Sequence, residues 1–212
     1  MSILNVIKSR RSIRKFKTKQ VNLDDVYQII EAGIWAPSSG NTMPFKFLVM
    51  TNKEQKNKFF TLVLNTVVNW KKEAAEEKGI TISELKHNYK QYLDGIQKAP
   101  VMIFLFFDLE IGAKEFTNQN IDEFIKNEYL YNSLRDSLYL CVENMLLEAS
   151  AIGLSSLYFE LPRAAKTPVN HLFNIDEKYE FFICLPIGYP DEDTLGKERN
   201  VEDFLIESKI KL

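Results

Sequence analysis

Apolar residues recur every three or four positions over several stretches of the chain, and this spacing is typical of amphipathic helices. Asn22 stands where it would cap one of these helices, and Pro37 stands where that helix would end. The strongest pattern follows Leu134 and stops at Gly153, a residue type that favours a helix C-terminus. The spacing predicts helices over residues 2–10, 22–36, 53–78, 83–97, 134–152 and 166–173.

Other stretches are rich in apolar, aromatic and β-branched residues, which predicts strands over residues 45–50, 101–107, 154–159 and 179–185. The run Val101–Phe107 has no polar residue, so we expect it at the centre of a sheet with both faces buried. Residues 12–16 are predicted to be extended, residues 116–131 fit neither period, and residues 201–206 begin a terminal helix or arm. Helices and strands interleave without regular alternation, and no repeat or linker divides them. We therefore predict one α+β domain over residues 1–212.

The predicted helix at 134–152 carries apolar residues on more than one face, among them Leu140, Leu146 and Leu147. A helix with one buried face would place polar residues at some of these positions. Two interpretations stay open: the helix is central to the core, or a second subunit covers part of it.

Composition narrows the class of protein. The chain has 212 residues, of which 45% are hydrophobic and 26% charged, enough for a core that needs no disulfide or metal. Its formal net charge of −2 gives no general attraction to nucleic acid or acidic membrane. Cys141 and Cys184 lie in apolar runs and are expected to be buried thiols.

The sequence also bears on where the protein is located. Residues 1–10 lack the apolar core of a signal peptide, and the longest apolar run, Ala99–Phe107, is too short to span a bilayer. We therefore expect a cytoplasmic protein without a membrane segment.

Several catalytic motifs are absent. The sequence has neither the Gly-x-Gly-x-x-Gly of a dinucleotide-binding fold nor the Gly-x-x-x-x-Gly-Lys-Ser/Thr of a phosphate-binding loop. His87 and His171 are the only histidines, which excludes a histidine-rich metal site and disfavours a hydrolytic triad. We expect no metal and assign no catalytic residue.

Six cations crowd into ten positions of this otherwise acidic protein: Arg10, Arg11, Arg14, Lys15, Lys17 and Lys19. The cluster fits a solvated helix end, where cations complement the helix dipole. It fits equally well a site for a phosphate monoester, which arginine forks and the Ser12 hydroxyl would bind. Nucleic acid is disfavoured because Phe16 is the only aromatic residue among the cations.

Two further segments are candidates for the same site. Residues 36–45 form a loop rich in small hydroxyl and amide side chains, which either pair with their own backbone or donate to a ligand. Lys197 and Arg199 belong either to a charged surface turn or, as two more cations, to the N-terminal cluster.

Taken in order, these segments resemble the nitroreductase family of flavoenzymes. The resemblance begins with Arg-Arg-Ser-x-Arg-x-Phe at Arg10–Phe16 and Ala-Pro-Ser-Ser-Gly-Asn at Ala36–Asn41. The remaining matches are Glu148–Leu154, Ile187–Pro190, Lys197 and Arg199. This resemblance implies an α+β fold with a mixed or antiparallel central sheet flanked by helices. It also implies an intertwined homodimer with two FMN molecules at the subunit interface.

The resemblance assigns roles by position. The residues implied to hold the FMN phosphate and ribityl chain are Arg10, Ser12, Lys197 and Arg199, with Arg11 contributing through its backbone. Arg14 matches a cation near the pyrimidine edge of the flavin, where it would stabilise the charge of the reduced ring. The loop that would reach the flavin from the other subunit contains Pro37, Ser38, Ser39 and Asn41.

A further stretch, Tyr158, Phe159 and Glu160, matches the segment that passes along the flavin ring, where a backbone N–H approaches N5. Two positions depart from the family pattern: Met43 stands where the family often has Gln, and Leu161 stands where it commonly has Gly. Met43 is expected to remove a polar contact near the site. Leu161 is expected to narrow the pocket or to shift the backbone there.

The implied activity is a ping-pong exchange, in which NAD(P)H reduces FMN and leaves before an electron-poor acceptor such as a nitroaromatic or quinone enters. Acceptor specificity is expected from residues 65–92 and 110–131. The aromatic residues of the second region line a pocket or pack a helix against the sheet: Phe116, Phe124, Tyr129 and Tyr131.

Three alternatives remain. The first is a specialised dehalogenating or flavin-destroying enzyme of the same fold. The second is a flavin-binding storage or regulatory protein without efficient turnover. The third is a module that uses the basic cluster to bind phosphate or nucleic acid.

Overall fold

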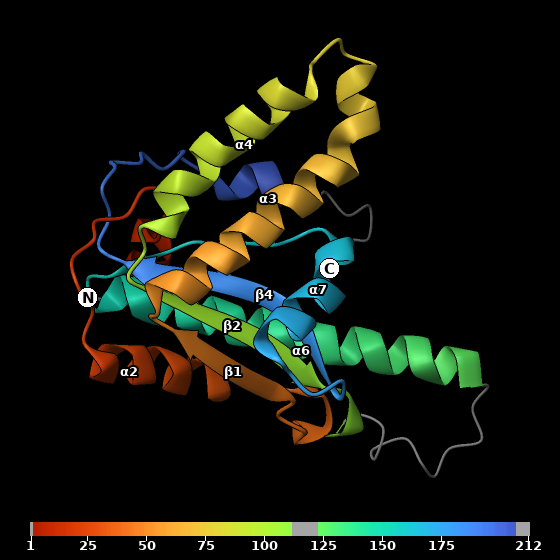
Figure 1. Cartoon of the computed structure of the whole chain (residues 1–212). Coiled ribbons are helices and arrows are strands. Elements are labelled where there is room, and N and C mark those ends of the chain that lie inside the picture. Colours follow the sequence, from red (N-terminus) through yellow and green to blue (C-terminus); the bar gives the residue numbers. More distant parts are fainter. Residues whose placement is uncertain (1, 112–122, 207–212) are drawn as a thin grey trace.

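The computed structural model of the protein describes residues 2–111 and 123–206 and has one four-stranded antiparallel sheet (Figure 1). The strands are β1 (Phe45–Met50), β2 (Val101–Asp108), β3 (Ser155–Ser156) and β4 (Tyr179–Gly188). Their order across the sheet is β1-β2-β4-β3, and each neighbouring pair is antiparallel. Helices cover both faces, so the predicted α+β fold with a central sheet is confirmed.

Strand β2 confirms the prediction made from its apolar sequence, because every residue from Val101 to Asp108 is buried. Alternate residues of a strand point to opposite faces, so β2 belongs to two cores at once. Val101, Ile103, Leu105 and Phe107 pack into one core, and Met102, Phe104 and Phe106 pack into the other. The strand therefore needs a layer of helices on each side.

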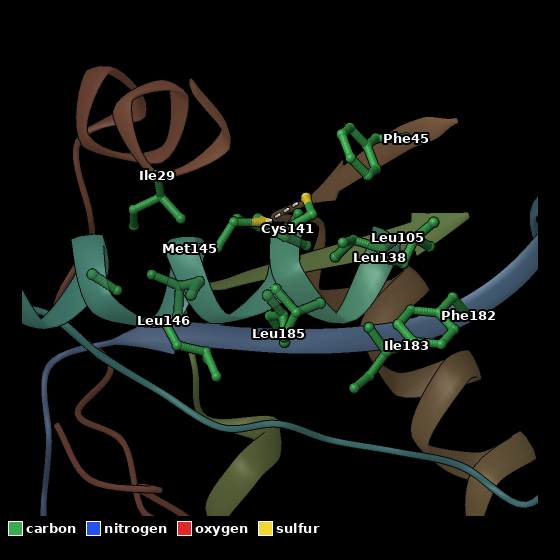
Figure 2. Close-up of a cluster of buried hydrophobic side chains, with 14 of the residues drawn as sticks. Ile29, Phe45, Leu105, Leu138, Cys141, Met145, Leu146, Phe182, Ile183 and Leu185 are labelled. Carbon is green, nitrogen blue, oxygen red and sulfur yellow. Dashed lines mark hydrogen bonds between the residues drawn. The ribbon is translucent and has the colours of Figure 1, made fainter. Parts of the chain in front are cut away.

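The first layer consists of α1 (Ile3–Ser9), α2 (Leu23–Ile34) and α6 (Glu123–Ala151). Figure 2 shows how α6 places Cys141 and Met145 between Ile29 of α2 and the side chains of the sheet. Both Cys141 and Cys184 are free and buried, as predicted. Burial raises the pKa of the Cys141 thiol to about 12.

The second layer consists of α3 (Lys53–Glu76), α4 (Ile82–Gln97) and α7 (Lys166–Phe173). Helices α3 and α4 form a hairpin whose tip projects away from the sheet (Figure 1). The base of this hairpin is held by Lys56, whose buried Nζ donates to the carbonyl oxygen of Ala99 at 2.7 Å. Burial and the nearby Lys53 ammonium lower the pKa of Lys56. This contact ties α3 to the turn that enters β2.

Most predicted elements end within a few residues of those observed, but the start predicted at Leu134 is wrong, because that helix begins at Glu123. Asn22 caps α2 by accepting from the N–H of Asp24. The remaining elements are short 3-10 helices: η1 (Ser39–Asn41), η2 (Arg163–Ala165) and η3 (Val201–Phe204). Residues 116–131, which fitted neither period, belong to α6 from Glu123 onward. Phe116 lies outside the described residues.

The strand predicted at 154–159 is wrong in length, because only Ser155 and Ser156 pair with β4 as a ladder. The backbone of Ser156 also serves the N-terminal segment, since its carbonyl oxygen accepts from the N–H of Ile13. The chain then leaves the ladder and returns to β4 only at Phe159. Within residues 2–111 and 123–206, no helix is both long enough and apolar enough to cross a membrane.

Candidate functional site

The basic N-terminal segment lies in extended form against the edge of the sheet. Ile13 donates its N–H to the Ser156 carbonyl at 3.0 Å, and Lys17 donates to the Tyr189 carbonyl at 2.9 Å. Phe16 is fully buried and pairs with Pro190. These contacts fix the backbone from which the arginine side chains extend.

Two glycines allow other elements to approach this segment closely. A Cβ atom at Gly95 of α4 would lie 2.5 Å from the carbonyl oxygen of Arg14. A Cβ atom at Gly196 would collide with the Arg11 guanidinium, which lies directly over that backbone. Arg11 and Arg14 are therefore positioned partly by the absence of side chains opposite them.

The C-terminal stretch returns to the same segment. Asp191 donates its N–H to the Lys15 carbonyl at 2.8 Å. The Glu192 carboxylate accepts from the backbone N–H groups of Arg14 and Lys15. With Gly196 against Arg11, the chain brings Lys197 next to the basic segment. Lys197 and Arg199 are both exposed.

Between these segments lies a cavity of about 140 Å³, whose lining includes Arg10, Arg11, Ser155, Ser156 and Thr194. Among the described residues, Arg11 Nε and Thr194 Oγ1 are buried without a hydrogen-bond partner. The Arg11 guanidinium also donates through Nη1 to the carbonyl oxygens of Lys8 and Arg10. An unsatisfied buried polar group costs about 1–3 kcal/mol, so the two atoms without a partner favour a further polar group at this cavity.

The charges around the cavity agree with an anionic ligand. The Nε of Arg10 is 3.9 Å from the Glu143 carboxylate, a long contact that leaves its guanidinium available. Two carboxylates, Glu192 and Asp193, also line the cavity. Glu192 is satisfied by backbone N–H groups, so its charge is already stabilised. Arginines, hydroxyls and an unsatisfied donor together form a set that fits a phosphate group.

Ser12 and Arg14 extend from the same backbone. In the described part of the chain, the Ser12 hydroxyl makes no hydrogen bond, whereas its carbonyl accepts from Arg14 Nη1 at 3.2 Å. The Arg14 side chain is exposed, and no carboxylate side chain of the described residues forms an ion pair with it. Arg14 is thus free to meet a ligand.

The stretch Tyr158–Glu160 follows directly from the serines of the cavity. The N–H of Phe159 donates to the Cys184 carbonyl at 3.1 Å, and the Phe159 side chain is buried. Phe159 therefore cannot supply the free N–H that was expected near a flavin. The Glu160 N–H has no acceptor among the described residues. Leu161, the second departure from the family pattern, is buried in the core.

The Tyr158 side chain is half-buried and stacks on Tyr139 of α6, with ring centroids 6.2 Å apart. Burial raises the pKa of the Tyr158 phenol, and Tyr139 and Glu160 raise it further. The phenol is therefore neutral at physiological pH and keeps its O–H as a donor.

A second cavity, of about 340 Å³, begins at this stretch and extends between α3 and α4. Its lining is formed by α3, α4 and residues 158–162, and it includes apolar, aromatic and charged side chains. The lining residues are Val63, Val67, Trp70, Lys71, Tyr89, Tyr92, Leu93, Tyr158, Phe159, Glu160, Leu161 and Pro162. The two cavities lie at the two ends of one stretch of backbone, residues 154–162.

The Pro37–Asn41 loop does not join the other predicted residues within one chain. Ser39 donates its N–H to the Ser137 hydroxyl, in the middle of α6. Ser150, which lines the first cavity, is 13 residues further along that helix, a rise of about 20 Å. Asn41 and Met43 have positive φ angles of 56° and 47°, conformations that non-glycine residues adopt at a cost and that often mark functional loops.

Some residues of the site were missed by sequence reasoning, namely Ser155, Ser156 and Thr194. The serine pair carries a signal, because it follows the predicted helix and opens a predicted strand. Thr194 carries no such signal in the sequence, because it is buried only where the C-terminal stretch packs against the basic segment. Among the described residues no group of three or more His, Cys, Asp or Glu side chains could hold a metal ion.

Comparisons with known proteins bear on the family and the fold. The model of the nitroreductase family matches residues 7–189. A protein of Archaeoglobus fulgidus, provisionally named NADH dehydrogenase/NAD(P)H nitroreductase, is 23% identical over 90% of this chain and 86% of its own.

Two solved structures share the fold. A BluB-like flavoprotein from Clostridium difficile 630 has a TM-score of 0.73 at 20% identity, covering 99% of this chain and 100% of its own. An iodotyrosine deiodinase bound to FMN and 3-iodo-L-tyrosine has a TM-score of 0.70 at 20% identity, and the match covers 100% of both chains.

The close approach of α4 to the basic segment predicts the effect of Gly95→Ala. In an open helix this change would add about 1 kcal/mol of stability. Here the new methyl group would press on the Arg14 carbonyl, and a backbone atom cannot rotate away. We expect a net loss of roughly 1–2 kcal/mol in the free energy of unfolding, measured by urea denaturation.

Asp94→Ala, at the exposed neighbouring position of α4, is the matched control and is expected to leave stability unchanged or slightly higher. A Gly95→Ala protein more stable than the wild type would show that the two backbones do not approach as described.

Proposed function

The chain belongs to the nitroreductase family of oxidoreductases, and we propose that it uses FMN to move electrons from NAD(P)H to an electron-poor small molecule. The observation that supports this most is the cavity with two unsatisfied buried polar groups, Arg11 Nε and Thr194 Oγ1, at one end of the 154–162 stretch. At its other end the same stretch borders an aromatic cavity. A phosphate in the first cavity, linked to a planar ring that lies along the 154–162 stretch, would leave the aromatic cavity open beside the ring.

The spacing supports the proposal. An extended backbone rises about 3.3 Å per residue, so Ser156 and Glu160 are separated by at most about 13 Å. That span suits a ligand whose phosphate and ring are joined by a short sugar chain. The residues proposed to hold the phosphate and this chain are Arg10, Arg11, Ser12, Lys197 and Arg199.

When bound, FMN would supply the redox chemistry. The protein would supply binding and electrostatics: Arg14 would lie near the pyrimidine edge, and the free N–H of Glu160 would donate to the ring. Tyr158 and Phe159 would contribute to the wall beside the ring. The neutral Tyr158 phenol would donate its proton in a hydrogen bond without adding negative charge.

We also propose that two copies of the chain form a homodimer and that the Pro37–Asn41 loop completes the site of the other copy. Within one chain that loop is held against the middle of α6. The chain exposes large apolar side chains over α1, α2, α6 and the C-terminal stretch: Ile3, Leu4, Ile7, Tyr27, Trp35, Leu140, Phe204, Leu205 and Ile206. A second copy would cover this surface, as monomers rarely expose so much of it.

The names of similar proteins support the donor and one rival activity. The Archaeoglobus fulgidus relative carries NAD(P)H in its provisional name, which favours NAD(P)H as the donor. The deiodinase structure favours, as a second candidate, a dehalogenating enzyme of the same fold. Both reactions would use the same flavin site.

The first test is the cofactor itself. We expect purified protein to be yellow, to release FMN on denaturation, and to lose its visible flavin absorbance when NAD(P)H is added without oxygen. A colourless protein that ignores added FMN would contradict the proposal. Bound flavin that NAD(P)H does not bleach would instead favour a storage protein, and salt-sensitive DNA binding would favour a nucleic-acid module.

Arg14→Ala tests the electrostatic role of this arginine. Removing a cation beside the ring should disfavour reduced, negatively charged flavin and lower its reduction potential. A tenfold decrease in the equilibrium constant for flavin reduction corresponds to a potential that is lower by about 30 mV, because the couple transfers two electrons. Lys17→Ala, which removes another exposed cation of the segment, is the control. Equal potentials in wild type and Arg14→Ala would remove Arg14 from this role.

Leu140→Glu tests the dimer. Leu140 is 49% exposed on α6, where a carboxylate would be buried without a partner if a second copy covered it. We expect the variant to be monomeric by light scattering and to lose most of its bound FMN. Asn69→Glu, at an exposed position of α3, should stay dimeric. A dimeric, FMN-loaded Leu140→Glu protein would show that the interface lies elsewhere.

A further inference from the structure

We propose that the aromatic cavity between α3, α4 and the 158–162 stretch selects aromatic carboxylates as electron acceptors, and that Lys71 binds their carboxylate group. This inference rests on the proposed flavin function and names the substrate class of that same site.

The size and lining of the cavity limit the ligand to a small ring. Its volume of about 340 Å³ lies at the lower end of the range for ligand pockets, about 300–1,000 Å³. Trp70 and Tyr92 line it and remain 63% and 42% exposed, although large aromatic side chains gain from burial. A planar ring stacked among them would cover these surfaces.

Lys71 gives the cavity its charge selectivity. Its Nζ lies 5.4 Å from the ring centroid of Trp70 and 5.6 Å from that of Tyr89, so two aromatic faces hold the ammonium at the cavity wall. The side chain is half-buried, and no carboxylate of the described residues forms an ion pair with it. A cation held at a cavity wall without a counter-ion favours an anionic ligand.

The anion that fits is a carboxylate attached to a ring. Among the side chains that the structure describes, no arginine lines this cavity, so the forked donors proposed to hold a phosphate group elsewhere in the molecule are not found here. A neutral ring would use the aromatic walls but would leave the Lys71 ammonium without a partner. An aromatic acid uses both features at once.

Glu160 sets the orientation of the bound acid. Among the described residues of the lining it is the one acidic residue, and it belongs to the 158–162 wall, whereas Lys71 belongs to α3. A carboxylate would be repelled by the first and attracted by the second, so the opposite end of the ring would face the 158–162 stretch. That is the stretch proposed to run along the flavin, so the reducible group would meet the electron source.

The test compares two acceptors that differ in one charge, 4-nitrobenzoate and 4-nitrobenzamide. NAD(P)H and one proton reduce either nitro group to a nitroso group with release of water, and NAD(P)H consumption is followed in FMN-loaded protein. We expect kcat/KM to favour the benzoate about tenfold, as one charge-assisted hydrogen bond of about 1.4 kcal/mol would give. Lys71→Met should remove this preference and leave the benzamide rate within about twofold.

Two control variants test whether the preference depends on the positive charge at Lys71. Lys71→Arg keeps the charge and should keep the preference for the benzoate. Lys72→Met removes the next lysine of α3, which is exposed and outside the lining, and should behave as wild type. Equal turnover of both acceptors by wild type, or a benzoate preference that survives in Lys71→Met, would overturn the inference.

Direct binding provides a second measurement that needs no turnover. Benzoate and benzamide are titrated against the FMN-loaded protein while tryptophan fluorescence is followed, with Trp70→Phe identifying the signal of Trp70. We expect benzoate to bind about tenfold more tightly than benzamide and Lys71→Met to bind them equally. Equal affinities in the wild type would overturn the inference.

The two proposals fail in distinguishable ways. Absence of FMN, or of NAD(P)H oxidation with either nitro compound, would contradict the proposed flavin function. Active, FMN-loaded enzyme without a Lys71-dependent preference would contradict only the choice of substrate class.

Discussion

The burial of β2 on both faces is the constraint on which the rest of the structure depends. Its run Val101–Phe107 has no polar side chain and is stable only if helices cover each side of the sheet, and the alternate residues of the run divide the interior into two cores. One layer is built on α6, which keeps apolar residues on its outer side as well. The other layer includes α3 and α4, whose packing on the sheet also creates the aromatic cavity between them. The fold, the proposed dimer surface on α6 and the aromatic cavity thus all follow from the burial of β2 on both faces.

The basic segment shows how a local positive site is maintained in a protein of net charge −2. Its side chains repel one another, and a mobile segment would spread them into solvent. Backbone hydrogen bonds to Ser156 and Tyr189, burial of Phe16, and the missing side chain at Gly95 hold it in one conformation instead. The cost of gathering cations is offset by apolar and backbone contacts, so the charges are left available for a ligand.

Sequence reasoning succeeded where a local pattern determines the structure. The apolar run at Val101–Phe107 predicts a buried central strand, and the spacing at Lys166–Phe173 predicts a helix with the observed bounds. It failed where the outcome depends on partners distant in sequence. Strand β3 pairs with β4 only at Ser155 and Ser156, while the Ser156 carbonyl accepts from Ile13, and no local pattern encodes these long-range pairings.

The candidate site follows the same rule. Arg10, Arg11 and Ser12 are recognisable as candidates for anion binding from their types and spacing. The unsatisfied Thr194 hydroxyl is not, because only the C-terminal return buries it. Lys71 is equally invisible in sequence, as one lysine of a long polar helix. Its significance arises when Trp70 and Tyr89 hold the ammonium at a cavity wall. Residue type identifies groups able to bind an anion, whereas three-dimensional packing determines which of them are left without a partner.

The distance between the cavity and the Pro37–Asn41 loop explains why the proposed site would need a second copy of the chain. Each chain carries the cavity proposed for the phosphate and the Pro37–Asn41 loop at different positions along α6, about 20 Å apart by the rise of the helix. A rigid helix cannot bend to join them, and α6 is fixed by its packing on β2 and α2. If both features serve one flavin, they must come from different chains. The apolar outer face of α6 then has a function of its own, because the contact that covers it would also complete the site.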